Sequence, residues 1–513
     1  MKGIEEEINN IKSVLRYYIG TVEKMRRIDV PLVDNQNDIE TALHALHHEV
    51  LDISRTVILL NDITKQRSSG IFIRPLIEVV NVMGYIDQNP SELDNYENIQ
   101  TEGFELIEQV DFSRYFKTPL NLSYLTELFR DSYIRNSYLI YPISRYEISF
   151  DLETTLRELK ITLHLLHLST KIYRRHVEKY LLPVTKEKLE VCRFETIRIF
   201  KPKEFEGHLD DVIQDYYKND ELPINEKEKL IKNIELIKRE NPIEKKDLSD
   251  IEAPTLLFRN INYIERDKEL NELVNLYFSL KETVEASFTG LEDDGSLEIF
   301  ATFMYDSFRL TETIIYLNTL KNYIESNIVH ATILENRLLV EYFHQFPEEV
   351  KRWKTTQDIL GTSLLAGKGS KEYFSKKPST RDGLLRNYRQ MDYTEFCNYI
   401  DNKGFENLKE RINEENFEDA KFFKLKFIRM SLKRAGLETE DELYSELSKY
   451  VHPNIDIAKK PKLVRDVDEE VQTLKKCLKH FSKHIDIIIS RYGHHMPYIN
   501  RLENRVEEIK ELS

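Results

Sequence analysis

The segment "DIETALHALHHEVLDISRTVILLNDI", residues 38–63, decides the fold class. Its apolar side chains recur every three or four positions and collect on one stripe, as an amphipathic helix packed against other helices requires. The stripe consists of Leu43, Leu46, Val50, Leu51, Ile53 and Val57. We therefore predict a helix over 38–63 and an all-α protein.

Two further segments have the same character. "SGIFIRPLIEVVNVMGYID" (69–87) is apolar almost all round, which predicts a buried helix. The segment 151–181 keeps an apolar stripe for about eight turns at 3.6 residues per turn. It begins at Asp151, a typical N-cap residue, and ends near Pro183.

Composition narrows the class of protein. The chain has 513 residues, enough for two or three domains. Only 15 are glycine, which disfavours β-sandwiches, glycine-rich phosphate loops and doubly wound folds. The net charge of −15 argues against broad, unspecific binding of nucleic acid.

The cysteines and the apolar runs indicate where the protein works. Cys192, Cys397 and Cys477 are far apart, so they predict neither a zinc site nor a disulfide framework. The N-terminus does not resemble a signal peptide, and we expect no apolar run to approach the roughly 20 residues of a membrane span. We expect a cytoplasmic protein with no membrane contact, no metal and no cofactor.

Four landmarks recur in the same order in the two halves of the chain, which predicts an internal duplication. They pair 55–67 with 312–324, Arg74 and Glu78 with Arg337 and Glu341, Ser137…Tyr141-Pro142 with Ser448…His452-Pro453, and the helix from Asp151 with 466–495. We predict one helical bundle over 1–199 and a second over 291–513, joined by a charged helical linker at 200–290. The second bundle contains an insertion at about 354–440.

The insertion carries a local cluster of basic residues with aromatic residues between them. Such a cluster in an acidic chain is the best candidate surface for phosphate or RNA, and a flexible lysine-rich loop is the alternative. The cluster comprises Lys368, Lys371, Lys376, Lys377, Arg381, Arg386 and Arg389.

Candidate catalytic residues lie in the second copy. Arg337 and Glu341 share a helix face, and their recurrence in the first copy favours a structural ion pair. His344 lies two turns after Arg337, where this alignment has Asn81 in the first copy, and His452 replaces a tyrosine. Histidine titrates near neutrality and suits acid–base chemistry, so an active site of this type belongs to the second copy. For His452 the alternative is structural, because a residue before proline ends a helix.

Histidines of the first copy form a second cluster at helical spacing. Four imidazoles in a bundle can bind zinc or iron, but the flanking leucines favour a packed face. These residues are His44, His47, His48, His164 and His167.

The motifs "RLLVE" (337–341) and "LSKYVHP" (447–453) resemble those of an uncharacterised all-helical bacterial family that is similar to the HEPN superfamily. Arg337-x6-His344 is similar to the Arg-x4–6-His motif of HEPN proteins, although position 338 is leucine where that motif has a polar residue. This resemblance implies two tandem HEPN-like bundles, and it implies a metal-independent ribonuclease or toxin-like effector of bacterial defence.

On this hypothesis the second copy cleaves RNA. His344 or His452 takes the 2′-hydroxyl proton, and Arg337 stabilises the charge on the phosphate. Glu341 and Ser448 complete the expected site. The alternative is a non-catalytic interaction or regulatory module that binds a nucleotide or a partner protein encoded at the same locus. A homo-oligomer is compatible with either function.

Overall fold

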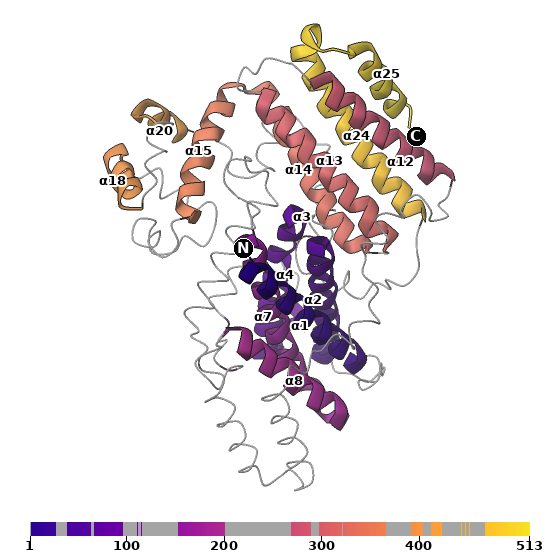
Figure 1. The fold of residues 1–513 in the computed structure, drawn as a ribbon, viewed down its shortest axis with the longest axis vertical. Coiled ribbons are helices and arrows are strands. Elements are labelled where there is room, and N and C mark those ends of the chain that lie inside the picture. The colour runs from indigo at the N-terminus through magenta and orange to yellow at the C-terminus, as the bar shows by residue number, and fades with distance from the viewer. Residues whose placement is uncertain are drawn as a thin grey trace. The chain divides into compact units, whose positions relative to one another are not determined.

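The computed structural model describes residues 2–26, 38–62, 66–95, 110, 114, 152–200, 268–288, 297–320, 322–365, 391–403, 412–422, 443, 447, 451 and 467–512. Every regular element within these ranges is helical, so the prediction of an all-α protein is confirmed (Figure 1). The helices cluster into two compact units.

The first unit is a bundle in which α7 packs against α1, α2 and α4, and α8 packs on α1 and α7. The apolar stripe predicted over 38–63 is buried, with Leu43, Leu46 and Val57 at 0% exposure. The elements of this unit are α1 (Lys2–Lys24), α2 (Asp38–Asp62), α3 (Gln66–Ile71), α4 (Ile73–Gln88), η2 (Pro90–Asn95), α7 (Leu152–Val177), η5 (Glu178–Tyr180) and α8 (Pro183–Phe200).

In the second unit, α13 packs against α14 and α24, while α12 packs on α24 and α25. A shorter group of helices follows α14, in which α20 packs against α15 and α18. The elements are α12 (Lys268–Phe288), α13 (Leu297–Thr319), α14 (Tyr323–Gln345), α15 (Glu348–Leu365), α18 (Tyr393–Lys403), α20 (Glu414–Ala420), α24 (Val467–Tyr492), η9 (Gly493–His495) and α25 (Ile499–Lys510).

Helix α12 lies inside the stretch 200–290 that the sequence analysis assigns to a linker. It buries Leu273, Tyr277 and Leu280, and the Tyr277 hydroxyl donates to the Phe308 carbonyl of α13 at 2.7 Å. Its apolar face therefore belongs to the core of the second unit, and the helical body of that unit begins before residue 291.

The segment Ser69–Gln88 is long and apolar enough to cross a membrane, which corrects the expectation that no apolar run approaches that length. It is 94% buried within the protein, as the core helix of a bundle is. A break at Phe72 divides it into α3 and α4. The prediction that this segment is a buried helix is confirmed.

The two units repeat the same helix–turn–helix geometry. Helices α7 and α24 each have 26 residues, and a three-residue 3-10 helix follows each of them. Leu181 and Met496 come next, both extended, and their N–H groups donate to the carbonyls of Glu178 and Gly493. Then α8 and α25 begin. Both 3-10 helices thus lie at the same distance from the preceding helix, but α25 starts one residue later in its corner than α8 does, after Tyr498 at φ 59°.

The ends of α4 and α14 also match. "YIDQNP" (85–90) and "YFHQFP" (342–347) close these helices, and the N–H groups of Asn89 and Phe346 donate to the carbonyls of Tyr85 and Tyr342. The caps have nearly the same torsions, with φ −130° and ψ 67° at Asn89 and φ −127° and ψ 73° at Phe346. A proline follows each cap and prevents the helix from continuing.

This shared helix end corrects the register of the predicted repeat. Arg74 lies fifteen residues before its cap and Arg337 nine before its cap, so the two Arg–Glu pairs are about 1.7 helical turns out of step. They are not equivalent positions. His344 corresponds to Asp87, two residues before the cap, and not to Asn81.

The buried cysteines give a simple test of the two cores. Cys192 and Cys477 are buried, and burial raises the pKa of both thiols, that of Cys477 to about 12. Because the thiolate is the reactive form, we expect a thiol reagent to modify only Cys397, which is half-buried, in the native protein. Titration with a dithiobisbenzoate reagent should give one thiol per native chain and three after denaturation in guanidinium. Two or three rapidly reacting thiols in the native protein would contradict this packing.

Candidate functional site

Part of the predicted site falls outside the described residues. Leu447 and Val451, which flank Ser448 and His452 in the sequence, are buried helical positions. The residues that fall outside are Ser448, His452 and the whole basic cluster of Lys368, Lys371, Lys376, Lys377, Arg381, Arg386 and Arg389.

The structure brings Arg337 and Glu341 together as an ion pair on α14. Arg337 Nη1 donates to Glu341 Oε2 at 2.8 Å, and the side chains are 1% and 22% exposed. The guanidinium is closed off from solvent, and Glu341 accepts a hydrogen bond from it. In the first unit Arg74 Nε donates to Glu78 Oε1 at 2.9 Å, and both residues are buried. The interpretation of these pairs as structural agrees with this burial.

Three buried histidines belong to the same core as Arg337. His330 and His480 lie with their Nε2 atoms 3.3 Å apart, and His484 Nε2 lies 3.1 Å from the Phe300 carbonyl. Burial lowers the pKa of His330 and His484 to about 3 and that of His480 well below its ordinary value. The charge of Arg337 adds to the effect at His480 and His484. These imidazoles are neutral side chains of the core at pH 7.

His344 is half-buried at the end of α14 and is held by α24. Its Nδ1 accepts a hydrogen bond from Arg491 Nε at 3.2 Å, and its carbonyl accepts from Arg491 Nη2 at 3.3 Å. Burial and the Arg491 charge lower the pKa of His344. Since Nδ1 accepts from Arg491, the neutral ring carries its proton on Nε2, and Nδ1 takes a second proton only when this hydrogen bond breaks.

The contact of His344 has a counterpart in the first unit. Asp87 accepts from His176 at 2.6 Å and from Arg175 at 2.7 Å. His176 lies two residues before η5, as Arg491 lies two residues before η9. The two units thus join the same helix ends by different side chains, which indicates that His344 fastens α14 to α24.

A pocket of about 460 Å³ opens in the first unit between α1, α7 and α8. Polar groups from all three helices converge on it, and one aliphatic side chain completes the wall. The lining consists of Tyr18, His167, Thr170, Lys171, Arg174, Arg175, Glu178, Leu189, Glu190 and Arg193.

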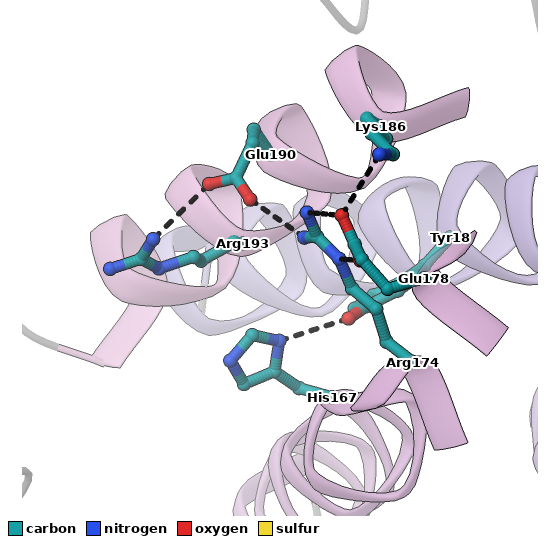
Figure 2. Close-up of polar contacts among 7 residues, drawn as sticks. All are labelled: Tyr18, His167, Arg174, Glu178, Lys186, Glu190 and Arg193. Carbon is teal, nitrogen blue, oxygen red and sulfur yellow. Dashed lines mark hydrogen bonds and ion pairs between the residues drawn. The ribbon is translucent and has the colours of Figure 1, made fainter. Parts of the chain in front are cut away.

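Tyr18 of α1 and His167 of α7 meet at the pocket (Figure 2). The distance between the Tyr18 hydroxyl and His167 Nδ1 is 2.9 Å, and both residues are buried. Burial raises the pKa of Tyr18 well above its ordinary value and lowers the pKa of His167 well below its own. The pair is therefore neutral at pH 7 and can offer a ligand hydrogen bonds but no charge.

Beside this pair, Figure 2 shows a chain of alternating charges that links α7, η5 and α8. Arg174 donates to Glu178 at 2.5 Å and to Glu190 at 2.8 Å, and Arg193 donates to the other Glu190 oxygen at 3.1 Å. Lys186 Nζ lies 3.3 Å from Glu178. Each charged group is thereby fixed in orientation.

The electrostatics of this chain follow from burial and pairing. Burial alone would raise the pKa of Glu190, but Arg193 and Arg174 lower it below its usual value. Burial opposes the charge of Arg174, yet Glu178 and Glu190 raise the pKa of Arg174. Both groups are thus charged over the physiological range of pH.

The histidines of the first unit pack as the sequence favoured. His44 Nδ1 lies 2.6 Å from the Tyr173 hydroxyl, and His47 Nε2 lies 3.2 Å from Thr170 Oγ1. No group of three or more His, Cys, Asp or Glu side chains within the described ranges is arranged to hold a metal ion.

Sequence reasoning missed the pocket. Its signals were the ion-pair spacings Arg174-x-x-x-Glu178 and Glu190-x-x-Arg193, which are common on exposed helix faces and gave no reason to single them out. No family model, curated protein or solved structure matches this chain.

Proposed function

We propose that this chain is a non-catalytic helical module that binds a small ligand in the pocket formed by α1, α7 and α8. The observation that carries the proposal is the convergence of polar groups from three helices on a pocket of about 460 Å³. Binding sites for small molecules usually have about 300–1,000 Å³ and a few fixed polar groups.

The state of the ionisable groups favours binding over proton transfer. A general base works best when its pKa lies near the operating pH. The pKa of His167 lies well below that range and the pKa of Tyr18 well above it. In the second unit Arg337 is 1% exposed, which leaves its guanidinium no access to a scissile phosphate. Among the described residues, the ribonuclease hypothesis therefore lacks an accessible cation to stabilise the charge on the phosphate.

The same proposal includes two tandem HEPN-like bundles produced by internal duplication. The repeated corner after α7 and α24, and the repeated caps of α4 and α14, support a common origin. The link to the HEPN superfamily rests on the motifs at 337–344 and 447–453. On this basis we place the chain in the bacterial cytoplasm, as a ligand-dependent regulatory partner in a defence system.

Incubation with RNA tests the absence of catalysis. We expect purified wild-type protein and the His344→Ala variant to leave a mixed RNA pool equally intact, because Arg337 is closed and His344 fastens two helices. Gel electrophoresis of labelled RNA measures the outcome, and circular dichroism checks that the variant folds. Cleavage by the wild type that His344→Ala abolishes would restore the ribonuclease and overturn this proposal.

A further inference from the structure

Three of the six charged residues that line the pocket have aliphatic counterparts in the second unit. Helices α7 and α24 have the same length, and each leads into a three-residue 3-10 helix. In the first turns of α8 and α25, the N–H groups of Lys186 and Leu502 donate to the carbonyls of Leu182 and Tyr498, which fixes the register. The pairs are Arg174 with Ile489, Glu190 with Val506, and Arg193 with Ile509.

In the second unit, the corresponding helices pack against each other without charged side chains at these three positions. Val506 and Ile509 are buried at 1% and 0% exposure, and α25 packs there on α12 and α24. Bringing charged groups together inside a protein is costly, and well-packed apolar residues commonly serve as well or better. The fold therefore does not require the charges of Arg174, Glu190 and Arg193, and their presence in the first unit points to a ligand.

The charge of the pocket selects the ligand's charge. Four cationic side chains line it, against the two carboxylates of Glu178 and Glu190. Among these lining side chains the surplus is therefore two positive charges. This surplus stands in a chain whose net charge is −15. A ligand with two negative charges matches it.

The geometry suits a phosphate group. Two carboxylates hold Arg174, and one of them also holds Arg193, so both guanidinium planes are fixed before a ligand arrives. Planar guanidinium groups match phosphate oxygens with paired hydrogen bonds, and preorganisation lowers the entropic cost of binding. A phosphate monoester carries close to two negative charges at pH 7, since its second pKa is about 6.

Resting on the proposed function, we infer that the pocket of the first unit binds a small phosphate monoester. Arg193 and Lys171 contact the phosphate, and the organic part of the ligand lies against Leu189. Arg174 does not contact the phosphate but holds Glu190 in place through their hydrogen bond. The Tyr18 hydroxyl borders that part, and the Thr170 hydroxyl, whose proton is donated to the Leu166 carbonyl, accepts a hydrogen bond from it.

Titration calorimetry on the full chain tests the ligand's chemistry with four probes. These are inorganic phosphate, a hexose 6-phosphate, a nucleoside 5′-monophosphate and a dicarboxylate of similar size. We expect a phosphate monoester to bind, with inorganic phosphate competing more weakly, and no heat with the dicarboxylate. Which monoester binds more tightly distinguishes a sugar from a nucleotide.

The matched variants are Arg193→Ala and Arg505→Ala. Both arginines lie on the last described helix of their unit, are 28% and 30% exposed, and pair with a glutamate three residues away. We expect Arg193→Ala to weaken binding by about tenfold or more, since a hydrogen bond between charged groups is lost, and Arg505→Ala to leave it unchanged. Arg193→Gln serves as a second variant if Arg193→Ala folds poorly by circular dichroism.

The outcomes separate the two claims. Equal phosphate binding by the wild type and by Arg193→Ala places the phosphate elsewhere and overturns the inference. Binding of the dicarboxylate alone, sensitive to Arg193→Ala, overturns the phosphate class and leaves the ligand-binding function in place. If none of the four probes binds, and a broader set of small metabolites also fails to raise the melting temperature, both proposals fall.

Discussion

Lowering the pH from 7.5 to 5 is expected to remove a large part of the stability of each unit. Burial lowers the pKa of His164, His330 and His484 to about 3. His47, His167 and His480 are also buried, with pKa values well below the ordinary one. Each unit thus contains three buried imidazoles that stay neutral in the folded protein.

The sign of the effect follows from proton linkage. Below pH 6.5 these histidines bind protons in the unfolded chain and not in the folded one, so the free energy of unfolding falls as the pH falls. Each contributes a loss of about 1.4 kcal/mol per pH unit, or about 6 kcal/mol for three histidines at pH 5. That is comparable with the whole stability of a domain, roughly 5–15 kcal/mol.

Urea unfolding followed by circular dichroism at pH 7.5, 6.5, 5.5 and 5.0 measures this loss. The carboxylates titrate mainly below this window, so the change reports the histidines. His480→Gln should flatten the pH dependence of the second unit by about a third, whereas His495→Gln, at an exposed position, should leave the dependence unchanged. Identical urea midpoints at pH 7.5 and 5 would show that the imidazoles are not buried as described.

Removing one member of the Arg337–Glu341 pair is expected to cost much more stability for one residue than for the other. Glu341→Ala leaves a guanidinium at 1% exposure without this carboxylate, which should cost about 3 kcal/mol or more. Arg337→Met leaves Glu341, at 22% exposure, in contact with water, and should cost about 1 kcal/mol or less. The asymmetry arises because the two partners differ in burial.

The double variant Glu341→Ala/Arg337→Met sharpens this test. We expect it to recover most of the stability that Glu341→Ala loses, because the buried guanidinium that lost this carboxylate is gone. Chemical denaturation of the four proteins at pH 7.5 measures the coupling. Equal losses for both single variants, with no recovery in the double variant, would refute the account of the pair as a structural contact.

The long helices were predictable because their apolar residues repeat with the helical period. The expected helices at 38–63, 69–87 and 466–495 agree closely with α2, with α3 and α4, and with α24 and η9. The predicted stop near Pro183 is also confirmed, since η5 ends at Tyr180 and a new helix begins at Pro183. Helix α12 was not predicted as part of a bundle, because the sequence around it is rich in charged residues and only one of its faces is apolar.

Register was harder to predict than helix position. Arg-x-x-x-Glu spacing recurs in many helices, so the match between Arg74 and Arg337 placed the halves six residues out of step. The Tyr-x-x-Gln-x-Pro ends of α4 and α14 carry the better alignment. These two motifs could be recognised as equivalent only from the structure, in which both caps have the same hydrogen bond and nearly the same torsions.

By itself the sequence determined that this protein is helical and that its halves resemble each other, because periodicity and residue order are local properties of the chain. Only the tertiary structure decided that Arg337 is closed off and that Tyr18, Arg174 and Arg193 border one pocket. Tyr18 lies more than 150 residues from the other two, and no local pattern records which helix faces meet. Packing brings these side chains together and sets how much water reaches them, and therefore which charges can act on a ligand.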